Sequence, residues 1–126
     1  MAVGREIGQF EMKYTSVTLE PGKSGSVTLH VNFEGSSSGE FECEALATMT
    51  VDSRDGKDGD YKVSARCFMA DGDIVDANGQ GKTNYGEDHT WAVAGITEVS
   101  GERAYAIQGH INLKDRSFVG KMFERN

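Results

Sequence analysis

Two cysteines are the residues whose type and spacing first suggest chemistry. Cys43 and Cys67 occur in consecutive segments of alternating apolar and polar residues, and each has the apolar phase of its segment. A hairpin between these segments would place the two thiols close together in one wall of the protein. No catalytic base is paired with either cysteine in the sequence, so we expect two reduced, buried thiols and not a nucleophile.

The three histidines have no metal-binding spacing. His30, His89 and His110 form no His-x-His or His-Glu-x-x-His arrangement. The acidic stretch 52–60 lacks the acids that an EF-hand loop needs, and Gly79-Gln80-Gly81 is not followed by the third glycine of a dinucleotide-binding loop. We therefore expect no metal and no cofactor.

One carboxylate could carry acid–base chemistry. In the segment 74–83, Ile74, Asp76 and Asn78 share one phase. If Ile74 points inward, Asp76 and Asn78 add a carboxylate and an amide to an apolar interior, where burial raises the carboxyl pKa and makes Asp76 a candidate catalytic acid or base. In the alternative, this is an exposed or irregular strand with Asp76 in water, and the usual exposure of aspartate slightly favours that alternative.

The charge distribution excludes several partners. The net charge is −7, and residues 34–60 hold eight acids against two bases. An acidic surface repels phosphate backbones, so we expect no nucleic-acid partner. No apolar run approaches the roughly 18 residues of a membrane helix, and the start lacks the apolar stretch of a secretory signal. We expect a cytoplasmic protein without a membrane partner, unless a leader was removed.

The elements that must position these residues are β-strands. Period-two alternation recurs along the chain, and no long segment keeps a helical apolar stripe. The clearest strand has an apolar face of Val27, Leu29, Val31 and Phe33. A change of phase in the first segment predicts a bulge near Thr15-Ser16. Seven turn sequences divide eight segments, at 21–25, 35–39, 55–59, 71–72, 84–86, 100–101 and 114–117.

Short connections make each strand the antiparallel neighbour of the next. An eight-stranded meander hides its edges best by closing on itself. We therefore predict one all-β domain, residues 1–126, folded as an antiparallel up-and-down barrel of about eight strands, with a β-sandwich as the alternative. The sequence leaves the oligomeric state open, and a homo-oligomer is compatible with it.

The interior of an eight-stranded barrel can be filled by side chains or can hold one small ligand. Alanines and glycines share the apolar phase with large aromatic residues, which either fill a tapered barrel or leave an aromatic-walled pocket for an apolar molecule. The candidate ligand-binding residues are Phe33, Tyr61, Trp91 and Tyr105, together with Asn78 if its segment faces inward.

The turn after Val99 decides which face carries the single tryptophan. A three-residue loop of residues 100–102 places Trp91 opposite Ile111 on the apolar face, whereas a two-residue loop places it opposite His110 on the polar face. Burying an indole is favourable by a few kcal/mol. We therefore predict the three-residue loop, with Trp91 in the lumen.

The last third of the chain has a distinctive spacing of glycines and aromatic residues. It contains Asp71-Gly72-Asp73, Gly79-Gln80-Gly81, Trp91-Ala92-Val93-Ala94-Gly95 and a final hairpin from Gly109 to Glu124. This pattern resembles the closing hairpins of allene-oxide-cyclase-like barrels within the calycin-type group. The resemblance implies a lumen that binds hydrophobic small molecules and, in some members, catalyses cofactor-free cyclisation or isomerisation. None of that group's catalytic residues can be placed on this sequence.

Three functions follow as hypotheses. The first is a barrel that binds a small apolar molecule and guides its cyclisation or isomerisation without a cofactor. The second is a lipocalin-like carrier or sensor of the same ligand class, and the third is a structural domain with a filled interior. A polar residue in an open lumen would favour the enzyme, a wholly apolar cavity the carrier, and the absence of a cavity the structural domain.

Overall fold

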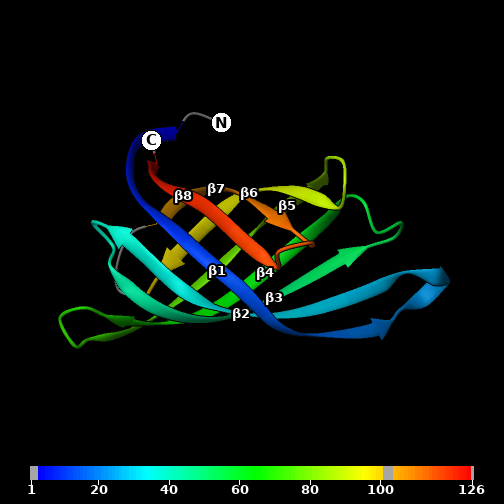
Figure 1. The fold of residues 1–126 in the computed structure, drawn as a ribbon, viewed down its shortest axis with the longest axis horizontal. Helices are drawn as coiled ribbons and strands as arrows, with labels where there is room; N and C mark the ends of the chain where they lie inside the picture. Colours follow the sequence, from blue (N-terminus) through cyan, green and yellow to red (C-terminus); the bar gives the residue numbers. More distant parts are fainter. Residues whose placement is uncertain (1–2, 101–103, 126) are drawn as a thin grey trace.

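The computed structural model describes residues 3–100 and 104–125, which form a closed barrel of eight antiparallel strands (Figure 1). Each strand pairs with the next, and the last pairs with the first. The strands are β1 (Val3–Pro21), β2 (Val27–Gly39), β3 (Cys43–Ser53), β4 (Gly59–Met69), β5 (Ile74–Tyr85), β6 (Thr90–Val99), β7 (Ala104–Asn112) and β8 (Ser117–Arg125). A 3-10 turn, η1 (Lys23–Gly25), joins β1 to β2. The predicted up-and-down barrel is confirmed.

Strand β1 closes the barrel because it pairs with β2 along one edge and with β8 along the other. Its pairing with β8 includes Phe10 opposite Gly120 and Lys13 opposite Ser117, so the sandwich alternative is wrong. The register between β1 and β2 shifts between Tyr14 and Ser16, which confirms the predicted bulge.

Beyond this bulge, β1 and β2 continue as a hairpin that reaches furthest out at one end of the barrel (Figure 1). We call residues 16–31 the arm. The pairs of β1 with β8 end at Lys13, so the far part of β1 has only β2 as a neighbour. Val17 and Leu19 on this part remain 42% and 64% exposed, although they continue the inward-facing phase of the strand.

The apolar side chains of β2 face inward as predicted, but they are not buried along the whole strand. Val31 and Phe33 are buried, whereas Val27 is 36% exposed. The physical reason is that Val27 lies on the arm, opposite Pro21, outside the closed part of the barrel. Val27 therefore keeps the predicted inward phase but is only partly covered.

The glycine- and serine-rich stretch 35–39 is not a turn, contrary to prediction. It continues β2, and the chain turns at residues 40–42. Gly35 is required by close approach of the neighbouring strand, because a Cβ built there would lie 2.1 Å from the carbonyl oxygen of Glu11 on β1. The true turn begins after Gly39, which has a φ of +96°.

Strands β6 and β7 pair in the register that the three-residue loop predicted. Trp91 lies opposite Ile111, Val93 opposite Gly109 and Gly95 opposite Ile107. The loop itself falls partly outside the described residues, since the structure describes nothing between 100 and 104. The register places Trp91 on the inner face, where it is half-buried.

Candidate functional site

The middle of the lumen is filled by one layer of large side chains. Phe33, Met49, Tyr61, Val93 and Phe118 are all buried and belong to one packed cluster. Met49 and Val93 are only 1% and 2% exposed, and the rings of Phe33 and Phe118 have centroids 5.4 Å apart. We call these five residues the central layer. It divides the lumen into two chambers, one toward each end of the barrel.

Two glycines make room for the ring of Tyr61 in this layer. A Cβ at Gly95 would lie 2.3 Å from Tyr61 Oη, and one at Gly81 would lie 2.8 Å from the edge of the same ring. Gly81 and Gly95 are direct partners across β5 and β6. Burial raises the pKa of Tyr61 to about 12, so its hydroxyl is neutral over the physiological range. The alternation of small and large residues is therefore partly a packing device.

The first chamber, which we call the open chamber, has a volume of about 200 Å³ and lies at the arm end of the barrel. Its lining is mainly apolar and comes from six of the eight strands and two loops. The lining side chains include Tyr14, Val17, Leu29, Val31, Phe33, Met49, Val51, Thr83, Trp91, Ile111 and Leu113. Trp91 packs edge-on against Tyr85, with ring centroids 5.2 Å apart, so one wall of this chamber is held by an aromatic pair.

The hydroxyl groups around the open chamber are already engaged by the backbone. Tyr14 donates to the carbonyl of Leu113 at 3.4 Å, and Thr83 donates to the carbonyl of Gly59 at 3.4 Å. Ser53 donates to the carbonyl of Asp58 at 2.9 Å. These hydroxyls stabilise the wall of the chamber and leave its surface largely apolar.

The second chamber, which we call the thiol chamber, has a volume of about 110 Å³ and lies beyond the central layer. Cys43 and Cys67 face it as free thiols and are buried, as predicted. A hydrogen bond between the two thiols lowers the pKa of Cys43 and raises the pKa of Cys67. Ser37 Oγ lies 3.3 Å from Cys43 Sγ and also donates to the carbonyl of Phe41. Phe41 and Tyr105, with ring centroids 6.2 Å apart, line the outer end of this chamber.

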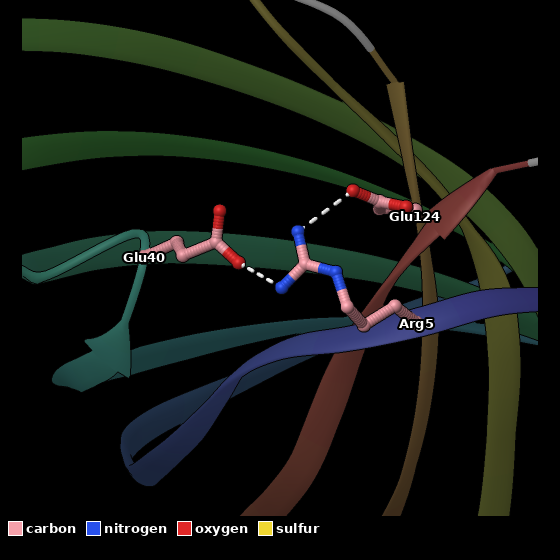
Figure 2. Close-up of polar contacts among 3 residues, drawn as sticks. All are labelled: Arg5, Glu40 and Glu124. Atoms are coloured by element: carbon pink, nitrogen blue, oxygen red, sulfur yellow. Dashed lines mark hydrogen bonds and ion pairs between the residues drawn. The ribbon is translucent and has the colours of Figure 1, made fainter.

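An ion-pair bridge holds the turn that carries Phe41. Figure 2 shows Arg5 of β1 between Glu40, in the turn after β2, and Glu124 of β8. The guanidinium donates to Glu124 at 2.9 Å, and the backbone N–H of Glu40 donates to the carbonyl of Ile7 at 2.8 Å. These exposed ion pairs are individually weak, but together they join β1, β8 and the β2–β3 turn at this end of the barrel.

Asp76 and Asn78 do not reach the lumen, contrary to the inward alternative. Both are exposed on the outer face, and Arg66 makes a two-pronged ion pair with Asp76 at 2.7 and 3.0 Å. This pair holds the pKa of Asp76 below its usual value. The inner face of β5 instead includes small residues such as Ala77, Gly79 and Gly81, so the strand has the opposite phase. Neither residue is therefore placed to act on a ligand in the lumen.

The other candidate residues all lie on the inner face, but in different chambers. Phe33 and Tyr61 belong to the central layer, Trp91 lines the open chamber and Tyr105 lines the thiol chamber. The sequence interpretation did not name Met49 or Phe118 as candidate site residues, although each has the apolar phase of its strand. Nothing in the alternation alone distinguishes a residue that divides the lumen from one that lines it.

No protein-family model, curated protein or solved structure matches this chain. The resemblance to allene-oxide-cyclase-like barrels is therefore supported only at the level of the fold, an eight-stranded antiparallel closed barrel. No helix of the described residues is long and apolar enough to cross a membrane.

Proposed function

We propose that this protein binds a small apolar molecule in the open chamber, with Trp91 in contact with the ligand. The observation that carries the proposal is a chamber of about 200 Å³ with a mainly apolar lining, continuous with exposed apolar side chains on the arm. Burial of a ligand's apolar surface there is favourable by roughly 25 cal/mol per Å². Drug-sized ligands usually occupy about 300–1,000 Å³. The ligand is therefore small, or it extends from the chamber along the arm.

A carrier or sensor is favoured over a cyclase or isomerase. The hydroxyls of Tyr14, Ser53 and Thr83 are engaged by backbone carbonyls, and Asp76 lies outside the lumen. A reaction in this chamber would have to proceed by confinement alone, without a carboxylate that exchanges protons. Lys57 of the β3–β4 loop lines this chamber but no carboxylate does, so the finer hypothesis of cofactor-free cyclisation lacks an acid–base pair, whereas binding needs only the apolar walls.

The test is a titration with N-phenyl-1-naphthylamine, an uncharged apolar fluorophore. We expect probe emission to rise on binding and Trp91 emission to fall by energy transfer, because the single tryptophan lines the chamber. Val51→Phe adds volume inside the chamber and is expected to weaken binding about tenfold, which corresponds to roughly 1.4 kcal/mol. Val119→Phe adds the same volume at an exposed position on β8 and is the matched control.

The proposal fails if the wild-type chain does not bind the probe. It also fails if Val51→Phe and Val119→Phe bind equally well, since the probe would then occupy an outer surface. Binding that leaves Trp91 emission unchanged would move the ligand away from the open chamber.

A further inference from the structure

Cys43 and Cys67 line the thiol chamber, and Met69 packs beside them. Cys43 lies directly opposite Met69 across β3 and β4, and Cys67 lies opposite Ala45, two residues from Met69 along β4. Directly opposite residues on one face have Cβ atoms about 4.5–5.5 Å apart, and alternate residues of a strand share a face. Met69 packs against the buried cluster that contains both cysteines. Two thiols and one thioether therefore converge from a single hairpin.

The surroundings of these sulfur atoms exclude hard metal ions. The side chains that line the thiol chamber are apolar apart from the hydroxyls of serine, threonine and tyrosine, and none of them is charged. Within residues 3–100 and 104–125, no group of three or more His, Cys, Asp or Glu side chains is placed to hold a metal. A structural zinc ion takes four such ligands, and calcium and magnesium take oxygen ligands.

We propose that Cys43, Cys67 and Met69 form a binding site for a soft monovalent ion of the Cu(I) class. Thiolate and thioether sulfurs are the ligands that select Cu(I), and such an ion is satisfied by two or three of them. On binding, one thiol loses its proton to solvent and forms a metal–thiolate bond, while the other two sulfurs donate lone pairs without further proton loss. The resulting unit carries no net charge, which an apolar chamber favours.

This site is independent of the proposed function. It lies beyond the central layer from the open chamber, and the two share no cysteine. A site of three sulfur atoms matches neither the ligand spacing of a zinc site nor that of a calcium loop. The signal that could have found it is the shared apolar phase of Cys43, Cys67 and Met69 on neighbouring strands.

The test is an anaerobic competition between the chain and the coloured Cu(I)–bicinchoninate complex, monitored by loss of colour. We expect the wild-type chain to withdraw one Cu(I) per molecule, and excess Zn²⁺ not to displace it. Cys43→Ser and Cys67→Ser are expected to lose this ability. Met69→Leu, a swap that conserves volume, is expected to weaken the withdrawal by roughly tenfold. Met49→Leu, in the central layer, is the matched control and should behave as the wild type.

The proposal is overturned if the wild-type chain leaves Cu(I) with the chelator, or if the folded serine variants withdraw as much as the wild type. Far-UV circular dichroism establishes whether the serine variants fold. If they do not fold, Met69→Leu is compared with Met49→Leu. Wild-type affinity for Cu(I) in both variants would contradict a role for Met69, and an equal loss of affinity in both would contradict a localised site.

Discussion

Replacing Phe33 by alanine tests the central layer, because this residue is 3% exposed and contacts rings from two other strands. Truncating a buried phenylalanine costs about 3–5 kcal/mol through lost burial and the cavity left behind. The neighbouring rings of Tyr14 and Phe118, at 6.3 and 5.4 Å, come from β1 and β8 and cannot easily collapse into the space. We therefore expect a loss near the middle of that range.

The assay is urea unfolding followed by Trp91 fluorescence and circular dichroism. With a urea dependence of about 2 kcal/mol per molar, a loss of 4 kcal/mol lowers the unfolding midpoint by about 2 M. Phe68→Ala removes the same side chain from an exposed position on the outer face and should change stability by about 0.5 kcal/mol or less. A Phe33→Ala variant within 1 kcal/mol of the wild type would refute the reasoning that this ring closes off the two chambers, and Phe33→Asp should unfold the domain outright.

Three further predictions use the same kind of measurement. Burial raises the pKa of Tyr61 to about 12, from about 10 in the unfolded chain. The neutral hydroxyl therefore contributes about 3 kcal/mol to the free energy of unfolding below pH 10, and this contribution is lost between pH 10 and 12. Tyr61→Phe should remove that part of the pH dependence of the urea midpoint, and an unchanged pH dependence in the variant would contradict the prediction. Gly95→Ala should destabilise the barrel by about 1–3 kcal/mol, since its Cβ would lie 2.3 Å from both Tyr61 Oη and the carbonyl oxygen of Gln80. Tyr61→Phe removes the first of these contacts and should lower the cost; equal costs in both backgrounds would show that the tyrosine hydroxyl is not the obstacle. Cys43 and Cys67 should resist the charged reagent dithiobis(nitrobenzoic acid) in the native protein and both react in denaturant, whereas rapid native labelling would show that the thiol chamber is open.

The strands could be predicted from the sequence because most of them have one apolar face and one polar face, so that apolar and polar residues alternate along the chain. The register of β6 and β7 followed from the benefit of burying Trp91, and the proximity of Cys43 and Cys67 followed from one hairpin. These inferences use only residues that are close in sequence or paired across one turn.

The division of the lumen could not be predicted in this way. Phe33 and Phe118 meet although they lie on β2 and β8, which are separated by β1, so their contact depends on the curvature of the closed barrel. The glycine at position 35 resembles a turn signal in the sequence and is instead a point of close contact with β1. The phase of β5 was ambiguous because its inner face includes Ala77, Gly79 and Gly81, which are too small to mark a core; the glycines are explained by close neighbours such as the ring of Tyr61 and the backbone of β6.

The closure of the barrel through β1 has a consequence for biosynthesis. β1 is the first strand to leave the ribosome and β8 is the last, and about 100 residues separate them. Because translation adds about 5–20 residues per second, one edge of β1 stays unpaired for roughly 5–20 s before β8 is synthesised. Until then the nascent chain is an open sheet with an unpaired edge, which is a template for association with other chains. We therefore expect the yield of soluble protein to depend on chaperone capacity during translation, even though β8 covers this edge of β1 as far as Lys13 in the finished barrel.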